Sequence, residues 1–333
     1  MTSSFSFNLH DLVRATVRGP EWLVSPVRSE LIHYISTDHE TAGELDLIVD
    51  LGYSGKPFPQ DFSGTGWHGS HLIASWKAGM EMPERSPARL VFRGNRASRF
   101  IVSKWIVEPA FRTLVEIKGN IMVHAATLSD GEKAVLVAGA GGAGKTTMAL
   151  SWLSSGHPYM SDDFSVISSA TSLPYITPMR IGVRNLVSNT ILQKLPVSSK
   201  LEILFRTAVR QASLGKVKFY FKRTIQQIDP LIKISDSAPI AGAIVLACPQ
   251  TSDAGESRSI QPQELADLMT KIDNEEMHKF GQGMLDKDFR ESHRKKLIKL
   301  FQDKPAIVVH GAPSPSEKDL VSVDALLEWA RSR

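Results

Sequence analysis

The sequence predicts a mixed α/β fold, with a small β-rich N-terminal domain and a larger second domain. The chain has 333 residues, which at ~150 residues per domain suits two domains. Short apolar runs typical of strands alternate with segments of helical periodicity. No repeat with a period of roughly 20 to 50 residues is present, which argues against solenoids and propellers.

Composition argues against several other classes of protein. With 42% hydrophobic and 22% charged residues, the chain is neither collagen-like nor wholly disordered. Its single cysteine, Cys248, cannot form an internal disulfide or supply a Cys-based zinc site. The longest strongly apolar run, 240–248, is far shorter than the ~20 residues of a membrane helix, and residues 1–24 lack the pattern of a secretory signal. We therefore expect a cytoplasmic protein without a membrane partner.

Residues 1–100 are expected to form the β-rich domain. Alternating residues in 45–51 and 89–93 are typical of strands. Clusters of Gly, Pro and Ser in 52–66 and 81–87 interrupt this pattern and predict turns. Substrate recognition is the role that we expect for this domain.

Residues 101–333 are expected to form the second domain. Apolar residues at helical spacing over 101–118 predict a helix, with a break at Pro109, that links the two domains. A hairpin and a strand–loop–helix unit then follow. Its predicted parts are a strand over 121–129, a turn at 130–131, a strand over 134–140, a helix over 146–155 and a helix stop at Gly156.

The rest of the chain continues the α/β pattern. A helix is expected from Ser198 or Ser199 to about Gly215. It carries one apolar stripe, formed by Leu201, Leu204, Phe205, Ala208, Val209 and Ala212. We further expect a strand over 242–248, helices over 262–278 and 289–301, a strand over 306–311 and a last helix over 323–331.

The segment GAGGAGKTT satisfies the pattern G-x-x-x-x-G-K-[ST] in full, between a predicted strand and a predicted helix. Glycines let successive backbone N–H groups point into one concavity, where they attract phosphate oxygens together with the helix N-terminus. Lys145 would neutralise the β- and γ-phosphates, and Thr146 would place its hydroxyl on Mg²⁺. A glycine-rich turn without a ligand is the alternative. The expected nucleotide-binding residues are Gly139, Ala140, Gly141, Gly142, Ala143, Gly144, Lys145, Thr146 and Thr147.

Asp162 and Asp163 follow Lys145 by one helix and a turn, directly before an alternating strand over 164–167. One carboxylate can hold Mg²⁺ while its neighbour accepts a proton from an incoming hydroxyl, and the assignment between the two stays open. Residues 157–161 are not the apolar run of an ordinary Walker B element, so a RecA-like ATPase core fits poorly. A surface turn is the other interpretation of the pair.

His124 lies among apolar residues of the predicted strand 121–129. By itself, this setting is more typical of a hydrogen-bonded core histidine than of a catalytic one.

Residues 123–168, VHAATLSDGEKAVLVAGAGGAGKTTMALSWLSSGHPYMSDDFSVIS, resemble the catalytic domain of HPr kinase/phosphorylase and its HPr-kinase-like relatives. That family has a strand histidine, a glycine loop ending in Gly-Lys-Ser/Thr, a helix with a Gly-His-like turn, and an Asp pair. The resemblance implies a P-loop domain of the phosphoenolpyruvate-carboxykinase-like type, in which ATP and Mg²⁺ phosphorylate a serine hydroxyl of a peptide or protein.

The resemblance also implies roles for individual residues. Lys145 and Thr146 would serve phosphate and metal. Asp162 and Asp163 would share metal binding with Thr146 and the acceptance of a proton. His124 would lie beside the transferred group.

One departure concerns the family's arginine-bearing signature PGRN. Its nearest match here is PMRIGVRN, with Arg180 and Arg184 as candidate phosphate or substrate contacts, and this match stands closer to the Asp pair than in the family. The departure argues against a reverse phosphorylase activity and against HPr as the substrate. Relatives that modify ribosomally made peptides, such as the serine kinases of lasso-peptide clusters, fit better. HPr kinases form hexamers, so a homo-oligomer is compatible with the resemblance.

Positive charge is concentrated in residues 191–225, which hold eight basic residues and one acidic residue, whereas the whole chain has a formal net charge of +4. This stretch could clamp an acidic peptide, cover the ATP phosphates or be a solvated helix face. Lys218 and Arg223 are the candidates for reaching into the site. Nucleic acid is a poorer partner, because one short basic run is not a recognised binding fold.

The sequence thus favours an ATP- and Mg²⁺-dependent kinase that phosphorylates a hydroxyl, with the serine of a peptide or protein as the expected acceptor. Two alternatives stay open. One is a nucleotide-gated binding protein without phosphotransfer, and the other is a small-molecule kinase on the same scaffold.

Overall fold

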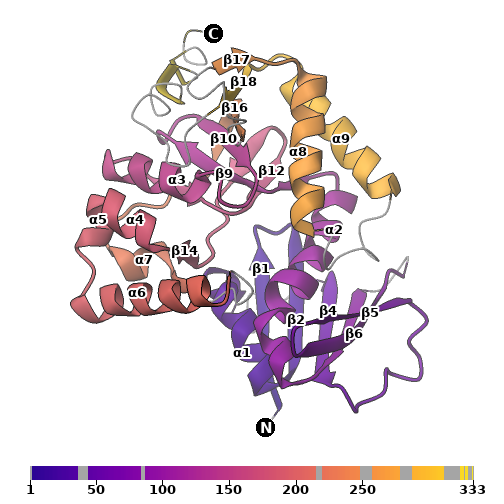
Figure 1. The fold of residues 1–333 in the computed structure, drawn as a ribbon. Coiled ribbons are helices and arrows are strands. Elements are labelled where there is room, and N and C mark those ends of the chain that lie inside the picture. Colours follow the sequence, from indigo (N-terminus) through magenta and orange to yellow (C-terminus); the bar gives the residue numbers. More distant parts are fainter. Residues whose placement is uncertain are drawn as a thin grey trace. The chain divides into compact units, whose positions relative to one another are not determined.

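The computed structural model describes residues 2–36, 44–83, 87–214, 220–247, 257–277, 287–310, 323–325, 327–328 and 332. The chain forms two units, one of residues 1–121 with 274–293 and one of residues 122–273 with 294–333. Both contain mixed sheets with helices packed on them, so the protein is mixed α/β (Figure 1). No helix within the described residues combines the length and apolar character that a bilayer span requires.

The first unit is built on a seven-stranded sheet with the order β3-β1-β2-β4-β7-β6-β5. Its pairs are antiparallel except for β2 with β4 and β4 with β7, which are parallel. The predicted strands over 45–51 and 89–93 are confirmed as β4 and β7. The seven strands are β1 (Thr2–Leu9), β2 (Val13–Pro20), β3 (Ile35–Ser36), β4 (Leu47–Tyr53), β5 (Thr65–His71), β6 (Ala74–Glu81) and β7 (Ala88–Gly94).

Helices α1 (Glu21–Glu30) and α2 (Glu108–Ile117) pack against strands of this sheet. The ring of Phe111 on α2 meets the ring of Phe7 on β1 edge-on, with centroids 5.9 Å apart. Short helices η1 (Ile32–Tyr34) and η2 (Arg96–Phe100) and the π-helix η3 (Val102–Val107) complete the N-terminal part of the unit. The predicted helix over 101–118, with its break near Pro109, is therefore observed as η3 running into α2.

The expected domain boundary at residue 100 lies inside this first unit rather than at its end. The reason is packing: Phe111, Leu114 and Val115 of α2 are buried. Farther along the chain, His293 lies 2.6 Å from the carboxylate of Glu116 on α2. Helix α2 therefore belongs to the core of the first unit.

The second unit is built on a nine-stranded mixed sheet. Its central path has the order β11-β9-β10-β16-β13-β12-β8, and β18 pairs with β16 and β17. Strands β10, β16 and β18 are parallel neighbours, and β9 pairs antiparallel with β10, as the predicted hairpin requires. The strands are β8 (Ile121–Val123), β9 (Ala125–Ser129), β10 (Ala134–Gly139), β11 (Tyr159–Ser161), β12 (Ser165–Ser168), β13 (Thr171–Leu173), β16 (Ala238–Ala247), β17 (Ser257–Ser259) and β18 (Ala306–His310).

The predicted single strand over 121–129 is wrong, because the chain bends at His124. Strand β8 pairs with β12, whereas β9 pairs with β10 and β11. The two halves thus join different strands of the sheet, and the bend places His124 between them.

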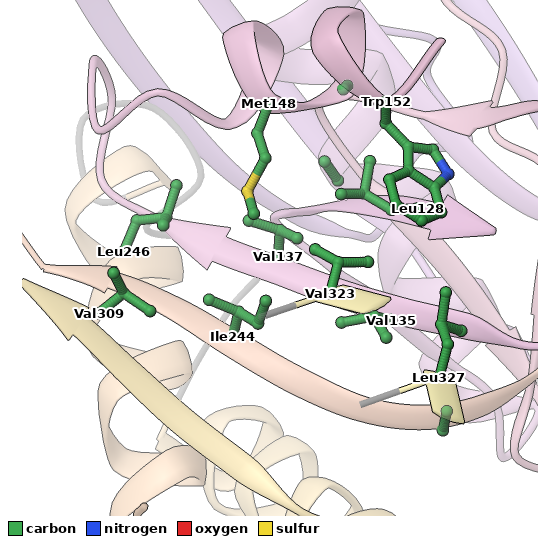
Figure 2. Packing of buried hydrophobic residues seen from close by; sticks show 13 residues of the cluster. Leu128, Val135, Val137, Met148, Trp152, Ile244, Leu246, Val309, Val323 and Leu327 are labelled. Carbon is green, nitrogen blue, oxygen red and sulfur yellow. The ribbon is translucent and has the colours of Figure 1, made fainter. Parts of the chain in front are cut away.

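Helix α3 (Lys145–Ser154) packs on the sheet through a large apolar cluster. Figure 2 shows Met148 of α3 above Val137 of β10 and Trp152 of α3 beside Leu128 of β9. Ile244 and Leu246 of β16 belong to the same cluster. The indole N–H of Trp152 donates to the carbonyl oxygen of Ser129, 2.7 Å away. Val323 and Leu327 close the cluster from the C-terminal segment. This packing fixes the start of α3 against the end of β10.

A second apolar cluster joins α3 to a group of short elements. These are β14 (Met179–Ile181), α4 (Val183–Ser188), α5 (Thr190–Gln193), α6 (Val197–Ala212), β15 (Phe221–Arg223) and α7 (Ile225–Ile228). Strands β14 and β15 form an antiparallel pair in which Arg180 faces Lys222. Helices α8 (Pro262–Met277) and α9 (Lys287–Phe301) follow later in the chain.

Candidate functional site

The glycine loop lies between the end of β10 and the start of α3, as its sequence context predicts. Gly142 and Gly144 have φ angles of 90° and 107°, in the left-handed region that favours glycine. A Cβ atom at Gly139 would lie 2.9 Å from Cβ of Ala143, so only glycine fits there without a shift. The loop is therefore a tight backbone turn ahead of a helix N-terminus, which is the geometry that binds phosphate.

Lys145, the first residue of α3, is buried and folds back over this loop. Its Nζ donates to the carbonyl oxygen of Gly139 at 2.5 Å and lies 3.5 Å from that of Ala140. The ammonium group thus sits beside the backbone of the loop. From this position it can offer positive charge to an anion bound by the loop.

Asp162 lies beside the glycine loop although it is distant from it in sequence. Its Oδ2 accepts a hydrogen bond of 3.3 Å from the hydroxyl of Thr146, and its Oδ1 accepts one of 2.8 Å from the hydroxyl of Tyr159. Asp162 is only 4% exposed, so these contacts hold its carboxylate in place. A hydroxyl and a carboxylate oxygen are hard donors of the kind that Mg²⁺ prefers.

Asp163 has different partners from those of Asp162. Its Oδ1 lies 3.5 Å from Nδ1 of His124, and its Oδ2 lies 3.9 Å from the guanidinium of Arg180. The side chain of Asp163 is 19% exposed. The two neighbouring carboxylates therefore have different surroundings. Asp162 contacts Thr146 next to the glycine loop, and Asp163 lies near His124 and Arg180.

His124 is held from two sides. Its backbone N–H donates to Oδ1 of Asp273 on α8 at 2.9 Å, and its ring meets the Phe164 ring edge-on with centroids 4.9 Å apart. Asp273 is itself 4% exposed. Sequence reasoning missed Asp273, because it stands 149 positions from His124 on an ordinary amphipathic helix and belongs to no motif.

Four buried hydroxyl groups join the strands that carry these residues. They belong to Thr127, Ser161, Ser165 and Ser172. Thr127 Oγ1 lies 2.6 Å from Ser165 Oγ and 3.1 Å from Ser172 Oγ, and Ser165 donates to the carbonyl oxygen of Ala125. Buried polar groups satisfied in this way resist sliding of β9, β11 and β12, so they fix the backbone on either side of the Asp pair.

The remaining predicted residues lie in three settings. Thr147 accepts a hydrogen bond from Asn185 at 2.9 Å and so joins α3 to α4. The guanidinium of Arg223 lies over the Phe221 ring and 3.8 Å from the Glu202 carboxylate. Lys218 and the side chain of Arg184 fall outside the described residues.

The Thr146 hydroxyl and the Asp162 carboxylate could hold Mg²⁺ only together with phosphate oxygens of a bound ligand. Within the described ranges, His, Cys, Asp and Glu side chains form no group of three that could hold a metal ion by themselves. Mg²⁺ in nucleotide sites is commonly bound through one or two protein oxygens plus phosphate oxygens. The Thr146 hydroxyl and the Asp162 carboxylate could supply these one or two protein oxygens.

Comparison of the chain with protein-family models and with curated proteins gives no match.

Proposed function

We propose that the protein is an HPr-kinase-like P-loop kinase, which uses ATP and Mg²⁺ to phosphorylate a hydroxyl group. The proposed acceptor is a serine of a peptide or protein. One observation carries the proposal: Asp162 Oδ2 lies 3.3 Å from the Thr146 hydroxyl, while the adjacent Asp163 lies 3.5 Å from His124. A full P-loop beside two carboxylates with different partners supplies both a nucleotide site and a proton acceptor.

The nucleotide side of the site would be formed by the glycine loop and α3. The loop N–H groups and Lys145 would receive the phosphates, and Thr146 with Asp162 would hold Mg²⁺. Bound Mg²⁺ supplies charge neutralisation on the phosphate oxygens. The hydroxyl of Tyr159 keeps Asp162 oriented through its 2.8 Å hydrogen bond.

The acceptor side would be formed by Asp163, His124 and Arg180. As the acceptor oxygen bonds to the γ-phosphorus, the bond from that phosphorus to the β–γ bridging oxygen breaks, and ADP leaves with the electron pair. The acceptor proton passes to the Asp163 carboxylate. His124 and Arg180, whose side chains lie 3.5 Å and 3.9 Å from its oxygens, orient that carboxylate.

The test is mass spectrometry of a panel of serine-containing peptides, free C-terminal serines included, incubated with Mg-ATP. We expect a phosphate mass gain with the wild type and a loss of about 10²- to 10⁴-fold in rate with Asp163→Asn, the range typical of a removed general base. ATP binding by Asp163→Asn, measured by calorimetry, should be retained. Asp236→Asn, at an exposed aspartate of the same unit, is the matched control and should keep full activity.

Other outcomes would redirect the proposal. ADP formation without any phosphopeptide or other phosphorylated acceptor would indicate an ATPase. ATP binding with neither ADP nor phosphopeptide would favour the nucleotide-gated binding protein. Undiminished transfer by Asp163→Asn would refute the role of Asp163 as base.

A further inference from the structure

The side chain of Asn185 joins the first turn of α3 to the end of β14. Its Oδ1 accepts a hydrogen bond of 3.0 Å from the backbone N–H of Gly182, and its Nδ2 donates one of 2.9 Å to the Thr147 hydroxyl. Because a backbone N–H can only donate, the Gly182 contact fixes which end of the amide faces Thr147. Helices α3 and α4 lie side by side in Figure 1, and Asn185 lies on α4. One amide group therefore ties the start of α3 to the segment that follows β14.

On the side of α3, this contact reaches the glycine loop. Thr147 is the third residue of α3, two positions after Lys145. The N–H groups of a first helical turn have no partner within the helix and attract an anion bound at that end. Since the Thr147 hydroxyl oxygen accepts from Asn185, the hydroxyl can still donate its own proton to a phosphate oxygen. Asn185 thus fixes a hydroxyl on the nucleotide side of the site.

On the side of β14, the contact holds the end of a short strand. The strand has three residues, and the two on either side of Arg180 are buried in the second apolar cluster. Side chains alternate between the two faces of a strand, so Arg180 projects from the other face. Its guanidinium lies 3.9 Å from the Asp163 carboxylate. Gly182 directly follows this strand, so its bond to Asn185 fixes the strand end that carries Arg180.

The hydrogen bonds of Asn185 add direction to an apolar contact. Leu150 and Leu153 of α3 lie in the same apolar cluster as the residues of β14. Hydrophobic contact is non-directional, whereas a hydrogen bond depends on both distance and angle. Asn185 therefore constrains how the end of β14 lies against the start of α3.

We propose that Asn185 is a positioning residue for phosphoryl transfer, which holds Arg180 beside Asp163 and the Thr147 hydroxyl beside the glycine loop. It acts through these side chains rather than on the reacting atoms. The proposal rests on the kinase function proposed above, because Arg180 and Asp163 form the acceptor side of that site. It adds a link between the acceptor side and the nucleotide side.

Replacing Asn185 should lower the rate of transfer through Arg180. The substrates are Mg-ATP and the serine peptide of the panel that gains phosphate fastest. We expect Asn185→Ala to lower kcat about tenfold in the wild-type background and less than about twofold when Arg180→Gln is already present, since residues that act through one another are not additive. A residue that only stabilised the fold would give the same loss in both backgrounds.

Asn185→Asp separates the two contacts of the amide. Its carboxylate keeps an oxygen for the Gly182 N–H, so kcat should stay within about threefold of the wild type. The same carboxylate has no N–H to donate to Thr147 and adds a negative charge on the nucleotide side, so the KM for ATP should rise about fivefold or more. A loss of kcat as large as that of Asn185→Ala would overturn the role of the Gly182 contact.

Asn189→Ala is the matched control, because Asn189 joins the same segment to the other end of α3. Its Nδ2 donates to the Ser154 hydroxyl at 2.9 Å, and its Oδ1 accepts from backbone N–H groups at the start of α5. Asn189 is buried. Asn189→Ala should therefore lower the free energy of unfolding and leave kcat within about twofold of the wild type.

Hydrogen exchange tests the Gly182 contact without any transfer. Exchange is followed by mass spectrometry of the peptide that contains Gly182, in the absence of nucleotide. We expect exchange to be about fivefold faster or more with Asn185→Ala, and unchanged with Asn185→Asp and Asn189→Ala, because only the alanine at 185 removes the acceptor of the Gly182 N–H. Equal exchange in Asn185→Ala and the wild type would overturn the proposal.

The positioning role and the kinase function fail in distinguishable ways. If the wild type phosphorylates the peptide and Asn185→Ala transfers at the same rate, or loses the same factor with and without Arg180, the positioning role is overturned and the kinase function stands. If Gly182 exchange responds as expected but the wild type phosphorylates no peptide, the kinase function fails. The role of Asn185 in transfer then falls with it, and only the structural contact stands.

Discussion

The backbone N–H of His124 donates a 2.9 Å hydrogen bond to Oδ1 of Asp273, a buried carboxylate on α8. His124 stands at the bend between β8 and β9, so its N–H is released from the regular pairing of a continuous strand. Asp273 supplies the acceptor that this donor would otherwise lack. The contact therefore stabilises the bend that places the histidine ring beside Asp163.

Replacing Asp273 should disturb both stability and phosphoryl transfer. Asp273→Ala leaves the His124 N–H without its acceptor, at an expected cost of about 1–3 kcal/mol in the free energy of unfolding. It should also lower the transfer rate, because His124 loses its position. Asp273→Asn keeps a side-chain oxygen and should restore part of both. Urea unfolding and initial rates measure the two effects, with Glu275→Ala on the same helix as the control. Equal rates for Asp273→Ala and wild type would contradict a positioning role.

Thr146 should govern the dependence on magnesium. Thr146→Ala removes the hydroxyl that contacts Asp162, so we expect the Mg²⁺ concentration needed for half-maximal activity to rise at least tenfold. Thr146→Ser retains the hydroxyl and should restore the wild-type dependence. Rates measured across a Mg²⁺ titration at saturating ATP separate the two variants. If alanine and serine behave alike, Thr146 is not a metal contact.

The first unit should depend strongly on the pair formed by Glu116 and His293. Their side chains are 3% and 2% exposed and lie 2.6 Å apart. Removing one partner of a buried hydrogen bond typically costs about 1–3 kcal/mol, so we expect Glu116→Ala to lower the free energy of unfolding by that order. Lys118→Ala breaks the more exposed pair with Asp46 in the same unit and should cost at most about 1 kcal/mol. Urea unfolding followed by tryptophan fluorescence compares them. If both variants lost a similar free energy of unfolding, burial would not distinguish the Glu116–His293 pair from the Lys118–Asp46 pair.

Asp61 should titrate at lower pH than an ordinary aspartate. The hydrogen bond from Arg89 is the main cause that lowers the pKa of Asp61 below its usual value of 3.8. Because the folded-state pKa is the lower one, the resulting stabilisation is present above the unfolded-state pKa and is lost as the pH falls through the folded-state pKa. Arg89→Gln should return the pKa of Asp61 to its ordinary range, as measured by NMR titration of the carboxyl carbon.

Glu264 provides the control for that titration. Its pKa is also lowered, chiefly by a hydrogen bond from Arg258 in the other unit. Arg89→Gln should leave the Glu264 titration unchanged. A shift at both sites would point to a general change in structure.

The local elements of this protein follow from the amino-acid sequence. The glycine loop, the helix that follows it and the hairpin before it are all predictable, because glycine positions and apolar periodicity act over a few neighbouring residues. Gly156 ends α3 with a φ angle of 89°, as a helix stop should. The Asp pair stands out in the sequence by its distance from Lys145, and its role stays a prediction.

Which residues meet and which faces are covered depends on contacts between segments far apart in the chain. Asp273 reaches His124 across 149 positions, and the predicted strand over 121–129 divides because its halves pair with different strands. The α6 stripe is as apolar as a core-facing one, yet Ile203 is the side chain that packs inside. The spacing of apolar residues along a helix determines how apolar each of its faces is. Whether it is buried depends on what the rest of the chain places opposite it, since hydrophobic burial is non-directional and requires a partner surface.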